Sequence, residues 1–401
     1  MHMLSRYEGA PVEEVRGATR RALENLVDLA MNEKTDFVLI CGDLYDGDWG
    51  DYQTGLFFIS QMAKLHDAGI PVCIVAGNHD AANRMTKRLR LPKTVRLLSP
   101  DEPDTLRLDN LGVAIHGQSF ISQAVYSDLS ENYPYAIPGM YNIGMLHTCV
   151  NGRPGYDPYA PCTIQGLSRK KYDYWALGHI HTREILSQDP PIIFSGNPQG
   201  RHIGETGPRG CMLVTVDERG SSSFEFRPLE KVRWERCEVD LSGAASESAF
   251  FERVSEGLTG VCGTTDLPLI VRLKLTGEFP AHEWISSQME QIANDVRSES
   301  IVRSGGRIWI EKIVFENTLR ATARPPTSAG PISELLDLVR ELASDPEYLK
   351  RTGDSLRQLW SRLPKEVRDS DDAISPDDPD GIAALIADVP ADLLRRLKGL
   401  H

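Results

Sequence analysis

The segment IPVCIVAGNHD occupies residues 70–80 and decides the fold class of this chain. Its first seven residues are apolar or small, and several are β-branched. A short apolar run of this kind that ends at a glycine is typical of a buried strand. Asn78 and His79 follow the glycine directly. The segment therefore predicts a buried strand whose end presents polar side chains.

Similar apolar runs lie on both sides of this segment, and a loop follows each of them. They are DFVLICGD, GVAIHGQSF, YNIGMLH, YDYWALGHIH, PIIFSGNP and CMLVTVD. Helical spacing of apolar residues appears between some of the runs, at 12–31 and 54–68. Alternating strands and helices predict an α/β layered sandwich, which we place at residues 1–236.

Two further regions are predicted beyond residue 236. Residues 237–320 alternate helix and strand patterns, which predicts a small α+β capping domain. Its helices are expected at 246–258 and 283–297, and its strands at 268–277 and 307–317. The Pro-rich segment ARPPTSAGP marks a boundary. Residues 321–401 predict a helical region, with helices at ISELLDLVRELA, SLRQLWSRL and IAALIADVPADLLRRLKGL.

Composition limits the partners of the chain. Its formal net charge is −13, which alone argues mildly against binding a polyanion. Bound divalent ions and local basic patches can still set the field at a site. The acids are unevenly spread, since EVRDSDDAISPDDPD at 366–380 holds seven of them and indicates a solvated linker. Seven scattered cysteines and the lack of a long apolar run predict free thiols, a cytoplasmic location and no membrane contact.

Polar residues with metal-binding side chains follow four of the predicted strands. They are Asp43 in GDLYD, Asn78 and His79 in GNHD, His147 in GMLHT, and His179 and His181 in GHIH. Parallel strands would deliver all of them to one carboxyl edge of the sheet. Oxygen and imidazole ligands together suit Mn, Fe or Zn better than Ca or Mg. Two adjacent cations favour phosphodiester hydrolysis, and a nearby imidazole can protonate the departing oxygen. We assign that second role to His79, with Asp80 to orient it.

Taken in order, these motifs resemble those of the calcineurin-like metallophosphoesterases. Their spacing and the two added regions look like those of DNA-repair nuclease subunits of the SbcD/YhaO type. The resemblance covers residues 5–236 well, and the two later regions only by architecture. The resemblance implies that Asp43 bridges two divalent ions, that Asn78, His147 and His179 hold one ion, and that His181 helps to hold the other. It also implies that His79 is the catalytic histidine.

One part of the family pattern is missing from this sequence. Family members begin with a strand that ends in Asp-x-His and supplies two ligands, whereas this chain begins MHMLSRYEGA. We therefore expect an N-terminal truncation, one incomplete metal site and impaired activity.

Simpler interpretations compete for single residues. Asp43 and Asn78 also suit turns, and a lone His147 would more often be a core histidine. His116 and the loop residues Arg201 and His202 are weaker candidates for lining the site. The basic runs at 87–96 and 169–171 suit either a DNA backbone or a solvated surface, and no aromatic-basic stacking platform is evident.

The leading hypothesis is a manganese-preferring DNA nuclease, an exonuclease in DNA repair. By resemblance, its C-terminal helices would dock on an SMC-like coiled-coil ATPase, and it could form a homodimer. One alternative is a phosphodiesterase that acts on a cyclic nucleotide or another small molecule. The other is an inactive scaffold for the ATPase.

Overall fold

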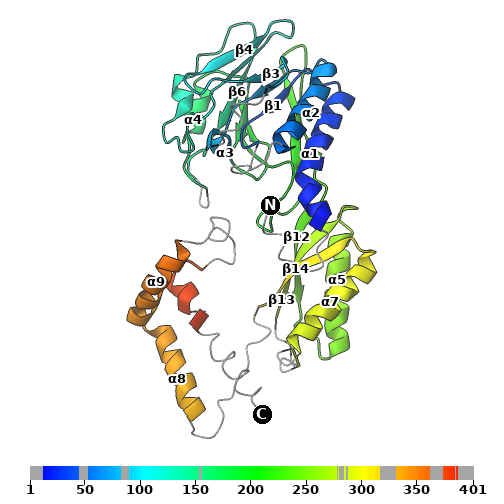
Figure 1. The fold of residues 1–401 in the computed structure, drawn as a ribbon, viewed down its shortest axis with the longest axis vertical. Helices are drawn as coiled ribbons and strands as arrows, with labels where there is room; N and C mark the ends of the chain where they lie inside the picture. The colour runs from blue at the N-terminus through cyan, green and yellow to red at the C-terminus, as the bar shows by residue number, and fades with distance from the viewer. Residues whose placement is uncertain are drawn as a thin grey trace. The chain divides into compact units, whose positions relative to one another are not determined.

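The computed structural model describes residues 12–44, 53–82, 90–152, 156–277, 279, 284–285, 288–316, 331–361, 374–383 and 385–386. The chain forms two compact units (Figure 1). The first unit holds Met1–Asp240, Ser246–Leu275 and Met289–Val314. The second holds Leu241–Ala245, Thr276–Gln288 and Phe315–His401.

A parallel three-stranded sheet begins the first unit. Its strands are, in spatial order, β1 (Val38–Ile40), β2 (Val72–Ile74) and β3 (Val95–Leu97). Helices α1 (Val12–Asn32) and α2 (Gln53–Asp67) lie side by side (Figure 1). Val27 of α1, and Phe58, Met62 and Leu65 of α2, are buried in one cluster with Val72 and Ile74 of β2. The predicted helices at 12–31 and 54–68 are therefore confirmed, since their apolar faces cover this sheet.

A six-stranded sheet carries most of the remaining predicted strands. Its spatial order is β4 (Asp104–Leu108), β5 (Val113–Gly117), β6 (Tyr141–His147), β7 (Tyr174–Gly178), β9 (Pro191–Phe194) and β8 (Glu184–Gln188). The four central strands run parallel, and the two edge strands pair antiparallel with them. The parallel strands β6 and β7 therefore end at the same edge of this sheet.

The two sheets stack face to face. Cys73 and Val75 from the first sheet pack with Ile115, Met145 and Ala176 of the second in one buried cluster. The hairpin of β10 (Gly210–Val216) and β11 (Ser222–Pro228) adds partly buried side chains to the same cluster. The predicted layered sandwich is confirmed. Our expectation that all the polar strand ends share one sheet edge is wrong. The strands β1 and β2 belong to one sheet, whereas β6 and β7 belong to the other, and the two sheets bury their apolar faces against each other.

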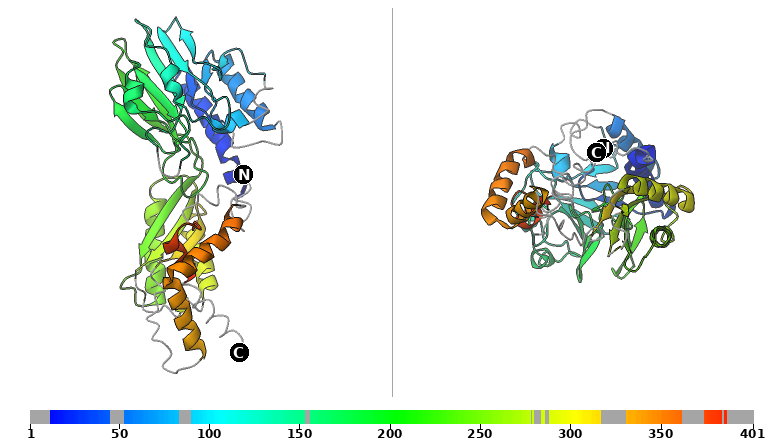
Figure 2. Two further views of the ribbon diagram at one scale, coloured as in Figure 1. Left: turned by 90° about the vertical axis from the view of Figure 1, so that its left-hand side faces the viewer. Right: turned by 90° about the horizontal axis from the view of Figure 1, so that it is seen from below.

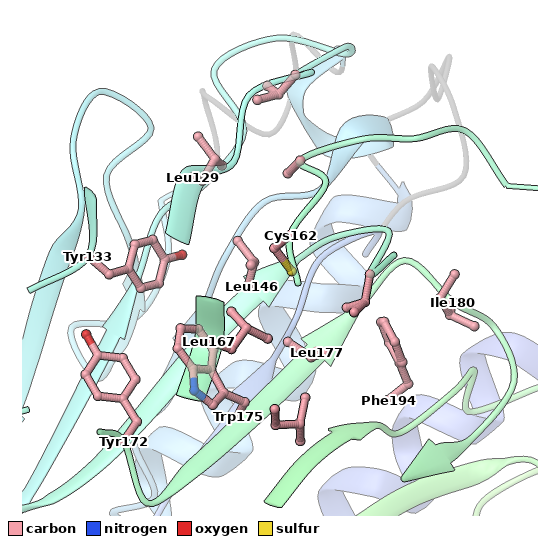
Figure 3. Packing of buried hydrophobic residues seen from close by; sticks show 14 of the residues in the cluster. Leu129, Tyr133, Leu146, Cys162, Leu167, Tyr172, Trp175, Leu177, Ile180 and Phe194 are labelled. Atoms are coloured by element: carbon pink, nitrogen blue, oxygen red, sulfur yellow. The ribbon is translucent and has the colours of Figure 1, made fainter. Parts of the chain in front are cut away.

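The outer face of the six-stranded sheet is covered by loops and short helices. Figure 3 shows the cluster, in which Trp175 and Leu177 of β7 pack with Leu146 of β6 and Phe194 of β9. Leu129 comes from the 3-10 helix η3 (Leu129–Asn132) and Leu167 from α4 (Ile164–Ser168). A side chain at Gly144 would overlap the buried Trp175 ring, so the strand beneath this ring needs glycine.

The α+β region of the first unit is built on a sheet of β12 (Arg233–Asp240), β13 (Leu269–Thr276) and β14 (Ile308–Phe315). Figures 1 and 2 show α5 (Glu247–Cys262) and α7 (Met289–Ser304) side by side on one face of this sheet. The α5 helix begins where predicted, because the Ser246 side chain accepts a hydrogen bond from the backbone N–H of Ala249.

The second helix of this region lies further along the chain than predicted. We expected it at 283–297, whereas α7 runs to Ser304. Its buried residues recur every fourth position at Ile292, Val296, Ser300 and Ser304. The small serines therefore extend the packed face beyond the last apolar residue, which a search for apolar spacing does not detect.

The second unit contains α8 (Pro331–Ser344) and α9 (Pro346–Trp360), which contact each other. We predicted the second of these helices at 355–363, but α9 starts earlier because Asp345 caps it and a proline follows at its first position. Leu338 and Leu359 are 50% and 61% exposed. The last predicted helix, at 382–400, falls mostly outside the described residues. None of the described helices has both the length and the apolar character needed to span a membrane.

Candidate metal centre

Asp43 lies in the turn directly after β1, where the backbone is unusual. Gly42 and Asp43 have φ angles of 97° and 53°, in the left-handed region that few side chains tolerate. Asp43 Oδ1 accepts a hydrogen bond of 3.1 Å from the backbone N–H of His79. The two polar strand ends of the first sheet are therefore tied together, and the left-handed turn directs the carboxylate toward the next strand.

Asn78 and His79 begin the short helix α3 (Asn78–Ala82), which follows β2. Gly77 precedes them, and a Cβ at Gly77 would overlap the side chains of Asp43 and His147. Asp80 accepts a hydrogen bond of 3.0 Å from the backbone N–H of Gly77. The glycine of the GNHD motif thus lets the other two side chains approach the backbone, and Asp80 holds the turn in place.

His147 ends β6 and is completely buried. Its Nδ1 lies 2.9 Å from the carbonyl oxygen of Cys41, which can only accept, so Nδ1 carries the proton. Burial lowers the pKa of His147, although Asp43 opposes this effect, and a neutral ring then has a lone pair on Nε2. That nitrogen lies 3.0 Å from Asn78 Oδ1 and 3.4 Å from Asp43 Oδ2. Three electron-rich atoms therefore converge with no proton between them.

His179 approaches the same point from the end of β7. Its φ angle of 98° takes the backbone out of the extended conformation, and its ring lies edge-on to that of His147 with centroids 5.1 Å apart. Nε2 lies 3.0 Å from the carbonyl oxygen of Asp157 and so donates to it, which leaves Nδ1 as the lone-pair atom. Burial and then the neighbouring His147 lower the pKa of His179 to about 4. Strain at a non-glycine residue is common where geometry serves a function.

The donor set fits a divalent cation. One ligand atom each from Asp43, His147 and His179 lie within 4.8 Å of one another. The imidazoles are neutral near pH 7, as metal binding requires. The lone pairs of His147 Nε2, Asn78 Oδ1 and Asp43 Oδ2 repel one another, and a positive ion between them would relieve this repulsion. Four of the predicted ligands, Asp43, Asn78, His147 and His179, are therefore brought together from two different sheets.

His181 lies on the same loop as His179 but outside that group of three. Its side chain is 27% exposed, and its Nδ1 lies 2.8 Å from Glu205 Oε1. The ring of Tyr156 stands edge-on to both His179 and His181, at 5.7 and 5.8 Å between centroids. The predicted role of His181 at a second ion stays a prediction, as does the catalytic role of His79.

Aromatic residues that the sequence analysis did not single out line this edge. Tyr159 packs against His179 at 5.8 Å, and Tyr126 packs against Tyr159 at 5.7 Å between centroids. Tyr126 is 66% exposed. These tyrosines lie in loops with no regular spacing, so nothing in the sequence pattern relates them to the histidines. We refer to Tyr126, Tyr156 and Tyr159 as the tyrosine rim.

Several weaker candidates have structural roles instead. His116 is buried, stacks on Tyr172, and lies within hydrogen-bonding distance of Thr105 and Asn142. Lys170, from the basic triplet, is also buried and donates to two backbone carbonyls. Arg96, from the other basic run, forms an ion pair of 2.7 Å with Asp104. The side chains of Lys170 and Arg96 are therefore both engaged by contacts within the sandwich.

Comparison with known proteins agrees with this fold. Residues 2–183 match the model of the calcineurin-like phosphoesterases, and residues 234–318 match that of the middle domain of metallophosphoesterase YhaO. This chain belongs to the calcineurin-like metallophosphoesterases.

Among individual relatives, the chain is similar to the metallophosphoesterase YhaO of Bacillus subtilis. The two are 34% identical over 275 residues, which cover 68% of this chain and 66% of YhaO. It is also similar to the DNA double-strand break repair protein Mre11 of Sulfurisphaera tokodaii, with 29% identity over 43% of this chain and 46% of that protein. The Mre11 of Methanopyrus kandleri is 23% identical over 60% of this chain and 58% of its own length. The matched stretches thus span between about half and two thirds of these relatives.

Proposed function

We propose that this chain is a manganese-dependent DNA nuclease that acts in DNA repair in the cytoplasm. The single observation that carries the proposal is a convergence of ligand atoms at the ends of strands from the two stacked sheets. The lone pairs of Asp43, Asn78 and His147 meet there, beside His179. The similarity to Mre11 proteins supports DNA as the substrate.

Each residue then has a defined task. Asp43, Asn78, His147 and His179 would hold one divalent ion, and Asp43 and His181 would contribute to a second. Divalent ions bound there would supply positive charge against the phosphoryl oxygens and acidify water. Cys41 and Asp157 fix the tautomers of His147 and His179 through their carbonyl oxygens, so that each ring presents a lone pair. His79 would protonate the departing oxygen.

The regions beyond the sandwich support a partner. We propose the division into 1–236, 237–320 and 321–401, with α8 and α9 as a docking surface for a coiled-coil ATPase. Exposed Leu338 and Leu359 on these two helices support this assignment, since exposed leucines on amphipathic helices often bind partner helices.

Cleavage assays on the purified protein test the proposed function. Labelled single- and double-stranded oligonucleotides and bis(p-nitrophenyl) phosphate would be incubated with Mn²⁺, and with a chelator as the control. We expect Mn²⁺-dependent cleavage of oligonucleotides. Turnover of the small diester alone would favour a small-molecule phosphodiesterase. No turnover of either substrate by protein that has bound Mn²⁺ would favour the scaffold.

The tyrosine rim leads to a separate prediction. Exposed aromatic rings near a nucleic-acid site stack on unpaired bases, and each stack contributes about 1–3 kcal/mol. Tyr126→Ala is therefore expected to raise the KM for a single-stranded oligonucleotide by roughly tenfold or more, which corresponds to about 1.4 kcal/mol. The KM for bis(p-nitrophenyl) phosphate should not change, because this small diester does not extend along a strand.

A matched control is available for this substitution. Tyr135 is 74% exposed and contacts Lys170, away from the histidines. Tyr135→Ala removes the same surface ring and should leave both KM values unchanged. Equal effects of the two substitutions on oligonucleotide KM would show that the rim has no specific role.

A further inference from the structure

Glu205 is a buried carboxylate that the metal centre described above does not include. It is 3% exposed and lies in the loop between β9 and β10. Its Oε1 is 2.8 Å from His181 Nδ1, and its Oε2 accepts a hydrogen bond of 2.8 Å from the backbone N–H of Arg201. Burying a charge is costly unless it is paired and hydrogen-bonded, so this carboxylate depends on the donors around it.

The surrounding loop holds this carboxylate rigidly. Oε1 also accepts hydrogen bonds of 3.0 Å from Asn197 Nδ2 and from Arg201 Nη2. Oε1 and Oε2 both accept from N–H donors, and the Arg201 guanidinium group forms an ion pair of 3.0 Å with Oε1. These contacts stabilise Glu205 as a carboxylate anion.

The same loop also holds the backbone of His181. The backbone N–H of Asn197 donates to the His181 carbonyl oxygen at 3.0 Å, and Arg209 donates to the same oxygen from its guanidinium group. Gly196 has a φ angle of 75°, and a Cβ there would lie 2.9 Å from that oxygen. The loop thus contacts both the backbone and the imidazole ring of His181.

These contacts decide the tautomer of His181. Arg201 Nη2 lies 3.1 Å from Nδ1, so in principle this nitrogen could accept from arginine. That arrangement would place a lone pair 2.8 Å from the Glu205 anion, whereas a proton on Nδ1 lets both His181 and Arg201 donate to the same carboxylate oxygen. The second arrangement explains the shorter distance and leaves Nε2 unprotonated. Within the described part of the chain, Nε2 of His181 has no hydrogen-bond partner.

We propose that Glu205 is a positioning residue that fixes His181 as the Nδ1–H tautomer and so presents Nε2 to a divalent metal ion. Arg201 assists by holding the carboxylate. This inference rests on the proposed function, because it assigns His181 to the second ion. A carboxylate behind a ligating imidazole orients the ring and increases its basicity, and removal of such a partner weakens metal binding by about 10–100-fold.

The test uses metal binding and spectroscopy on the full chain. In the metal-free wild type, nitrogen-15 NMR of labelled histidines should report His181 as the Nδ1–H tautomer, with His181→Gln to assign the signal. Glu205→Ala should remove this preference and weaken calorimetrically measured binding of one Mn²⁺ by about 10–100-fold. Glu205→Gln keeps an oxygen that can accept from Nδ1–H, so it should restore the tautomer and most of the affinity.

Glu311→Ala controls for the loss of a buried charge. Glu311 is 8% exposed and pairs with Arg272 at 2.8 Å, in the sheet of β12 to β14. This substitution should lower stability and leave both the tautomer and the Mn²⁺ affinity unchanged. An Nε2–H tautomer in the wild type would overturn the proposal, even if Glu205→Ala does not fold. Unchanged Mn²⁺ binding by a folded Glu205→Ala variant would also overturn it, whereas a lack of DNA cleavage with these readouts intact would count against the proposed function alone.

Discussion

Replacing His147 with asparagine is expected to lower Mn²⁺-dependent hydrolysis by more than about a hundredfold, since loss of even an outer-shell partner costs roughly 10–100-fold. His147 is completely buried, and its Nε2 faces Asp43 and Asn78 at 3.4 and 3.0 Å. The shorter asparagine side chain cannot place a donor atom at the same point. Turnover should fall, and the increase in melting temperature that Mn²⁺ produces in the wild type should be lost as well. A ligand present at 100 times its Kd stabilises the folded state by about 2.7 kcal/mol, so the loss of binding is measurable.

His116→Asn is the matched control for this substitution. His116 is also completely buried, but it contacts Thr105 and Asn142 within the six-stranded sheet. Its loss leaves buried polar groups without partners and should cost about 1–3 kcal/mol of stability. The folded variant should keep its turnover and its response to Mn²⁺. The metal centre as described would be wrong if His147→Asn behaved like this control.

Much of the fold could be predicted because its strands are short apolar runs that end at glycine. The run around Val72–Ile74 is an example, and the polar residues after it identified Asn78 as a candidate ligand. The pairing of strands was not predictable, because an apolar run has the same pattern in either of two stacked sheets. Asp43 and His147 therefore meet across two sheets.

The finer geometry of the site depends on contacts between distant loops. Glu205 contacts His181 from 24 residues away, and the loop that carries it has no periodic pattern. Tyr126 lies near the histidines only because the loops before and after β6 fold over the same edge. The strained φ of His179 is likewise imposed by packing and not by its residue type. Sequence spacing thus identified ligand types but not the groups that orient them.

Replacing His79 with asparagine should lower kcat for oligonucleotide cleavage by about 10²–10⁴-fold, the range typical of a lost general acid. The hydrogen bond between His79 and Asp43 uses the backbone N–H, at 3.1 Å from Oδ1, so asparagine at this position can still form it. Mn²⁺ affinity should therefore stay near the wild-type value while the proton donor is lost. The substitution separates holding the metal centre from protonating the departing oxygen.

The leaving group provides the decisive comparison for His79. An alkoxide that departs from a nucleotide needs a proton, whereas p-nitrophenolate is stable without one. His79→Asn should therefore affect bis(p-nitrophenyl) phosphate far less than an oligonucleotide, measured as kcat for each substrate at saturating Mn²⁺. Equal losses on the two substrates would mean that the imidazole does not act as the acid. A lower Mn²⁺ affinity in the variant would instead assign His79 to the ligands, because the change would then act on ion binding before any proton is transferred.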